Sequence, residues 1–147
     1  MLKRNLFMLI GLALYAASFA LPAISSSSAA GGAVRGYLCA WITLTVPWGH
    51  DGMNVFHDKP FVYIAILVSG LTNIVFLITT ALMLMNRREK LAAIFRVLLL
   101  LMLPCSWFIL YELKFVAREG HYMWILGMLL VVFSNELTGF RRVSATP

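Results

Sequence analysis

The fold is decided by PFVYIAILVSGLTNIVFLITTALMLM-NRREK-LAAIFRVLLLLMLPCSWFILY, residues 60 to 111. This stretch holds two long apolar runs separated by a basic segment, Asn86 to Lys90. About 20 apolar residues in a helix cross the roughly 30 Å hydrocarbon core of a bilayer, and each run is long enough. We therefore predict a membrane hairpin, with spanning helices at 61–85 and 91–111 joined by a short cytoplasmic turn.

The composition of the rest of the chain agrees with a membrane protein. Of the 147 residues, 61% are hydrophobic and only 12% are charged, against roughly 25% charged in soluble domains. The net charge of +6 comes from basic residues that flank the apolar runs instead of forming one patch. We expect them to set topology and meet lipid headgroups, so a nucleic-acid partner is not predicted. The length fits a single membrane domain, 1–147.

Two further apolar runs complete the predicted bundle, at 6–24 and 122–140. The first could instead be a cleaved signal peptide, because basic residues precede it and small residues end it. It is longer than the usual roughly 7–15-residue core of such a peptide, which favours a retained helix. The predicted fold class is therefore all-α: a polytopic membrane protein with four transmembrane helices.

Residues 25–59 form the one long connection, which we predict to be an extracytoplasmic cap. Within it, Tyr37, Trp41, Leu44 and Trp48 follow helical spacing. Aromatic side chains of this kind prefer the headgroup level, so 36–48 is predicted as a short surface helix and candidate interface. The alternating, mostly β-branched residues 42–46 leave a half-buried strand as the alternative.

Three remaining connections are predicted to lack regular structure. Ser25 to Gly32 reads as a flexible loop. Gly49 to Lys59 is polar and turn-rich, and Asp58 and Pro60 are suited to open the helix that follows. Glu112 to Gly120 reads as a short charged loop.

The short loops predict the orientation, because Lys and Arg are retained on the cytoplasmic side. With both termini cytoplasmic, that side holds more basic residues than the outer side. The inner set is Lys3, Arg4, Arg87, Arg88, Lys90, Arg141 and Arg142, and the outer set is Arg35, Lys59, Lys114 and Arg118. A bacterial inner membrane is the expected location.

Four polar residues within the apolar runs are candidates for helix contacts or a pore: Ser69, Asn73, Arg96 and Glu136. Polar residues in lipid are costly, so they are functional candidates by default. Ser69 and Asn73 share a face with Ala65, which also suits close helix packing and hydrogen bonding between helices. Arg96 and Glu136 both lie near the inner surface, where they could form an ion pair.

Metal and thiol chemistry are weaker alternatives. His50-Asp51 and His57-Asp58, with Glu119 and His121, could supply ligands, but their spacing matches no standard metal site. Cys39 and Cys105 could form a disulfide on an oxidising outer side. No Cys-x-x-Cys motif accompanies them, and buried free thiols are the more common outcome. We therefore predict no metal, no cofactor and no enzymatic activity.

The arrangement resembles small four-helix bacterial inner-membrane proteins of unknown function. The shared features are Lys3-Arg4 before the first helix, Leu21-Pro22-Ala23 closing it, the aromatic segment 36–48, Arg87-Arg88, and Gly120-His121-Tyr122-Met123-Trp124 opening the last helix. Such proteins often carry an aromatic residue and Asn-Pro where this chain has Asp58-Lys59-Pro60. The resemblance implies the four-helix layout and carries over no catalytic residue.

These observations predict a non-enzymatic accessory or immunity-type protein that binds a partner within the membrane or at the cap. Its interface would use Tyr37, Trp41 and Trp48 or the face of Ala65, Ser69 and Asn73. The alternative is a small transporter or channel-forming oligomer, with Asn73 and Glu136 lining a path. Expected partners are the lipid bilayer and either a second membrane protein or further copies of the chain.

Overall fold

The computed structural model describes residues 2–26, 32–85 and 89–138, apart from the side chains of 2–4 and 50–52. Most of the described residues are helical, as predicted. The centre of the predicted flexible loop, the basic pair Arg87-Arg88 and the closing pair Arg141-Arg142 lie outside the described residues.

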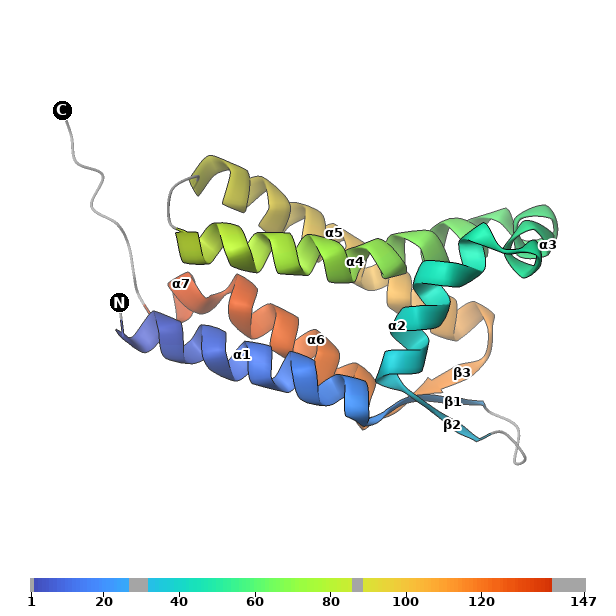
Figure 1. The fold of residues 1–147 in the computed structure, drawn as a ribbon, viewed down its shortest axis with the longest axis horizontal. Coiled ribbons are helices and arrows are strands. Elements are labelled where there is room, and N and C mark those ends of the chain that lie inside the picture. Colours follow the sequence, from blue (N-terminus) through green and yellow to red (C-terminus); the bar gives the residue numbers. More distant parts are fainter. Residues whose placement is uncertain (1, 27–31, 86–88, 139–147) are drawn as a thin grey trace.

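Four long helices form two pairs (Figure 1). Helix α1 (Leu2–Ala20) packs along α6 (Glu119–Val132), and α4 (Pro60–Met85) packs along α5 (Glu89–Glu112). Helix α6 ends at Phe133, and a single turn, α7 (Ser134–Leu137), follows it. The start of α1, the end of α4, the start of α5 and α7 share one end of the bundle, which we call the inner end; the opposite end is the outer end.

Two of the described helices, α4 and α5, are long and apolar enough to cross a membrane. They match the predicted hairpin closely. The apolar parts of α1 and α6, residues 5–20 and 119–132, are shorter than predicted. The run 6–24 stops being helical at Ala20 because Pro22 begins a strand, and the run 122–140 is interrupted at Phe133.

A small antiparallel sheet at the outer end was not predicted. Strand β1 (Pro22–Ser26) lies between β2 (Ala33–Arg35) and β3 (Phe115–Ala117). Residues 25 and 26, expected in a flexible loop, and residues 115–117, expected in a charged loop, are therefore strand residues. Lys114 adopts a left-handed backbone conformation with φ of 53° just before β3, where the chain turns out of α5.

The sheet connects parts of the chain that are far apart in sequence. Ser25 pairs with Ala33 on one side and with Val116 on the other. The backbone N–H of Arg118 donates to Ala23 O at 2.8 Å, and its Nε donates to Ser25 Oγ at 2.9 Å. The end of α1 is thus fixed to the start of α6 by strand pairing and by a side-chain bond.

The cap consists of α2 (Gly36–Thr45), the 3-10 turn η1 (Val46–Trp48) and α3 (His50–Asp58). The helix predicted within 36–48 is confirmed, and the alternative strand through 42–46 is wrong. The turn-rich loop predicted for 49–59 is also wrong, because α3 fills it. Phe56 packs edge-on against Tyr63 with ring centroids 5.2 Å apart, so packing on α4 supports this polar helix. Asp58, expected to cap α4, is instead the last residue of α3, whereas α4 begins at Pro60 as predicted.

Helices α1 and α6 approach closely at two glycines. A Cβ built on Gly127 would lie 2.7 Å from Gly11 O, and one on Gly11 would lie 2.7 Å from Gly127 O. No side chain fits between two backbones at that distance. Small residues at the crossing are how membrane helices bring their backbones into contact.

An apolar cluster with residues from all four long helices forms the core of the bundle. Phe76, Leu99 and Met128 are fully buried, each from a different helix, and Tyr15 packs on Phe76 with ring centroids 4.5 Å apart. Met8, Val131 and Val132 extend this core towards the inner end. Buried polar side chains lie on both sides of this cluster: Ser18, Ser69, Ser106 and His121 beneath the cap, and Thr79, Thr80 and Ser134 towards the inner end.

Candidate functional site

Helix α2 presents two different faces. Its aromatic residues point outward: Tyr37 is 50% exposed and Trp41 66%, and Trp48 of the following turn is 78% exposed. Its small residues, Gly36, Cys39, Ala40 and Thr43, line a cavity on the opposite face. The predicted aromatic stripe is therefore a real surface feature, which we call the aromatic face (Tyr37, Trp41 and Trp48).

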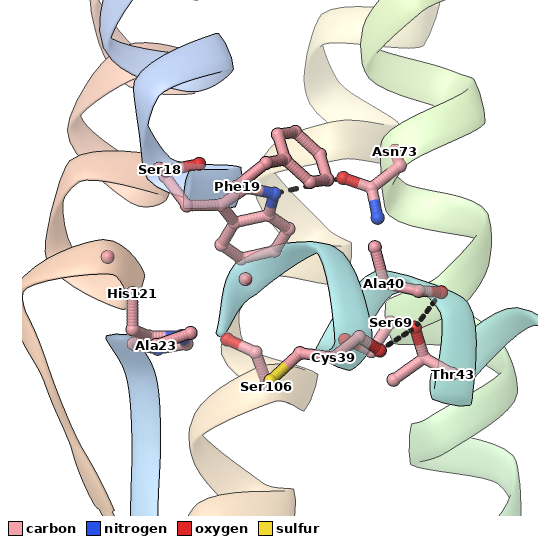
Figure 2. A pocket seen from close by; sticks show the side chains of 13 residues that line it. Ser18, Phe19, Ala23, Cys39, Ala40, Thr43, Ser69, Asn73, Ser106 and His121 are labelled. Atoms are coloured by element: carbon pink, nitrogen blue, oxygen red, sulfur yellow. Dashed lines mark hydrogen bonds between the residues drawn. The ribbon is translucent and has the colours of Figure 1, made fainter. Parts of the chain in front are cut away.

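The cavity lies under α2, where both helix pairs meet the cap (Figure 2). Its volume is about 70 Å³, and about 10–15 Å³ of such space holds one water molecule. Besides the small residues of α2, it is lined by Ser18, Phe19, Ala23, Ser69, Asn73, Ser106, Gly120, His121 and Trp124. Every long helix contributes to it.

Close backbone contacts hold α2 above the cavity. The N–H of Gly36 donates to Leu21 O at 2.9 Å, and a Cβ on Gly36 would clash with Ser18 O. Further along, a Cβ on Gly70 of α4 would lie 2.6 Å from Thr43 O. The cap helix is therefore fitted against α1 at its start and against α4 near its end.

Asn73 joins the two helix pairs. Its Oδ1 accepts hydrogen bonds from Tyr15 OH of α1 at 3.0 Å and from Trp124 Nε1 of α6 at 2.9 Å. Figure 2 shows its amide nitrogen pointing towards the cavity. Ser69, one turn earlier on α4, is buried and lines the same cavity. The two candidates from α4 thus lie together, as their spacing indicated.

His121 is the most unusual group in the cavity. It is 8% exposed, and its Nε2 is buried without a hydrogen-bond partner among the described residues. The ring stacks on Trp124 with centroids 5.8 Å apart and meets Trp107 edge-on at 5.3 Å. The sequence predicted His121 only as the first residue of a span. In the structure it is buried inside the bundle, near its outer end.

Three hydroxyl groups around the cavity donate to backbone carbonyls of their own helices. Ser18 Oγ donates to Tyr15 O at 2.6 Å, Thr43 Oγ1 to Cys39 O at 3.0 Å, and Ser106 Oγ to Leu103 O at 2.8 Å. With these protons occupied, the three oxygens are left as hydrogen-bond acceptors.

Arg96 and Glu136 form an ion pair at the inner end, away from the cavity. The side chain of Glu136 is 54% exposed and that of Arg96 is 19% exposed. Glu136 lies in α7, beyond the inner end of α6, whereas Trp124 lies in the outer half of α6. The four candidate residues therefore form two separate groups, Ser69 with Asn73 and Arg96 with Glu136.

The Cys, His, Asp and Glu residues considered for metal or thiol chemistry do not form a cluster among the residues whose side chains are described. Cys39 and Cys105 are both free thiols. Among the residues whose side chains are described, no group of three or more His, Cys, Asp or Glu residues is placed to hold a metal ion. The side chains of His50 and Asp51 lie outside the described residues.

Burial raises the pKa of the Cys39 thiol to about 11, an effect larger than the opposing backbone hydrogen bond. In a Cys105→Ser variant at pH 7.5, we expect Cys39 to react with iodoacetamide about 100-fold more slowly in the folded protein than in a denatured control, because thiolate is the nucleophile. The rate should rise with pH up to about 11. Equal rates in both states would contradict this burial.

Tyr15, Ser18 and Trp124 were not predicted as site residues, and His121 was not predicted to be buried in the cavity wall. The sequence did contain one indication of Tyr15 and Ser18. Gly11, Tyr15 and Ser18 are spaced i, i+4 and i+7, so these interruptions of an apolar run fall on one helix face. All three are buried in the structure.

Comparison with known proteins finds no matching family model, no matching curated protein and no matching solved structure.

Proposed function

We propose that the chain is an integral protein of a bacterial inner membrane, that all four long helices cross the bilayer, and that the inner end is cytoplasmic. The apolar lengths of α4 and α5 support the membrane location. Helices α1 and α6 lie alongside them and carry exposed apolar side chains such as Leu9 and Leu126. The larger number of Lys and Arg residues in the sequence segments predicted to be cytoplasmic supports the orientation.

Single cysteines placed at the two ends test this orientation. In a chain lacking Cys39 and Cys105, we expect Gly32→Cys to react with a membrane-impermeant maleimide in intact cells. Lys90→Cys, which is also exposed but follows the inner turn, should react only after the cells are permeabilised. Labelling of Lys90→Cys in intact cells would contradict the proposed topology.

Within this membrane setting, we propose that the protein acts by binding a second integral membrane protein through its aromatic face. The observation that carries this proposal is the division of α2 into a fitted inner face and an exposed aromatic outer face. Tyr and Trp dominate interaction energy at protein interfaces and suit the level of the headgroups. A surface of this kind fits a partner with an apolar outer-leaflet surface.

The core gives less support to the alternative of a path through one subunit. Phe76 and Met128 follow Asn73 and Trp124 by about one turn towards the inner end, and both are fully buried. Leu99 of α5 belongs to the same buried cluster. A continuous polar route from Asn73 to Glu136 would have to pass these three side chains.

A pull-down of the intact protein in mild detergent tests the proposed partner binding. We expect a stoichiometric membrane protein to co-purify, and a Tyr37→Ala/Trp41→Ala variant to retain less than about a tenth of it, because aromatic anchors carry most of the binding energy. Tyr111→Ala is the matched control, since Tyr111 is an 81% exposed aromatic residue on α5. Recovery of only a homo-oligomer, or an equal loss in the control, would count against the proposal.

A further inference from the structure

We propose that the cavity beneath α2 is a binding site for a small uncharged polyol group, either free glycerol or the terminal glyceryl group of a lipid headgroup. The inference is independent of the proposed partner, because the cavity and the aromatic face lie on opposite sides of α2. It rests on the His121 nitrogen that has no partner among the described residues, on the few hydrogen-bonding groups in a largely apolar lining, on the absence of ionised side chains among the described lining residues, and on the size of the cavity.

His121 indicates that something polar occupies the cavity. A buried polar atom without a partner is destabilising, and native proteins rarely leave one unsatisfied. His121 Nε2 is such an atom, and its residue is 92% buried in the wall of a cavity of about 70 Å³. A hydroxyl group suits it, because a hydroxyl donates to an unprotonated Nε2 or accepts from a protonated one.

The other hydrogen-bonding groups of the cavity lining favour a ligand with more than one hydroxyl. Ser18, Thr43 and Ser106 offer acceptor oxygens, since each hydroxyl proton is already used within its own helix. Asn73 turns its amide nitrogen, a donor, towards the same space. A ligand that carries several hydroxyls can donate hydrogen bonds to these hydroxyl oxygens and accept one from the Asn73 amide.

Charge and size narrow the ligand class. Among the described residues that line the cavity, none is Asp, Glu, Lys or Arg. An ionised ligand group would be buried there without a counter-charge, which is strongly unfavourable. The volume of about 70 Å³ corresponds to roughly five to seven water-sized groups. Glycerol has a size within this range and no charge.

Saturation-transfer NMR with glycerol, on protein in deuterated detergent and glycerol-free buffer, tests the free-polyol source. We expect transfer from the protein to the carbon-bound protons of glycerol, and its loss in His121→Phe, which keeps an aromatic ring beside Trp124. Thr43→Val should weaken glycerol binding about five-fold, the effect of one hydrogen bond. Its matched control is Thr80→Val, because Thr80 donates to Phe76 O in the same way but lies outside the cavity lining.

Mass spectrometry of lipids that co-purify with the protein tests the lipid source. We expect lipids with a glyceryl headgroup to be enriched over the bulk membrane with wild type and with Thr80→Val, and depleted with Thr43→Val. Either glycerol transfer or this lipid enrichment supports the site and identifies its source. If neither depends on Thr43 and His121, the cavity holds water only and the proposal is overturned. Comparison of Thr43→Val with Thr80→Val tests the proposed site even if His121→Phe fails to fold.

Discussion

Replacing Gly127 with valine is expected to lower the free energy of unfolding by about 3 kcal/mol, the upper part of the range for overpacked sites. The added Cβ would meet Gly11 O and Tyr15 N, each at 2.7 Å. Both atoms belong to the α1 backbone, so relief requires moving a whole helix. The change should be measured by helical circular dichroism during unfolding in mixed micelles of mild detergent and SDS.

Two control variants separate the effect of the α1–α6 contact from the effect of introducing a valine. Gly32→Val adds the same side chain where a Cβ meets no atom within 4 Å. Leu126→Val places a β-branched residue in α6 at a position that is 49% exposed. Both should change stability by less than about 1 kcal/mol, as surface substitutions generally do. A Gly127→Val protein as stable as these controls would show that α1 and α6 do not cross at the glycines.

Replacing Asn73 with leucine is expected to destabilise the protein by about 2 kcal/mol. The substitution removes the acceptor of both Tyr15 OH and Trp124 Nε1 and leaves two donors unpaired. Hydrogen bonds between membrane helices contribute about 0.6 kcal/mol on average and up to about 1.7. The same detergent unfolding experiment measures the effect. Thr72→Val is the control, because this fully buried hydroxyl of α4 donates to Val68 O in its own helix.

A double-mutant cycle separates this bridge from general loss of packing. Tyr15→Phe should cost stability in the wild type and almost none in the Asn73→Leu background, since the bond is already absent. Equal costs in both backgrounds would contradict the bridge. In vesicles, altered ion flux in Asn73→Leu with intact partner binding would favour the channel alternative over the accessory role.

The features predicted correctly depend on local composition. The uncharged run at 61–85 and the apolar run at 91–111 are long enough to specify α4 and α5 without knowledge of their neighbours. The aromatic spacing of Tyr37 and Trp41 likewise identified α2 and its exposed face. In each case one physical property repeats over enough residues to indicate a helix, although the strand alternative for 42–46 was removed only by the structure.

The features that were missed depend on contacts between distant parts of the chain. Strand β1 consists of Pro, Ala, Ile and two Ser residues, of which only Ile favours strands, and it is held in place by pairing with β2 and β3. Helix α3 is polar and contains Gly52, yet it packs against α4. The partners of Asn73 could not be named either, because they lie 58 and 51 residues away on α1 and α6.

The pairing of α1 with α6 has a consequence for how the protein is made. The ribosome synthesises α1 long before α6. Ser25 precedes its hydrogen-bond partner Arg118 by 93 residues. During that interval the face of Gly11, Tyr15 and Ser18 has none of its native neighbours from α6. This face of α1 must therefore stay accessible until α6 has been synthesised and can pack against it.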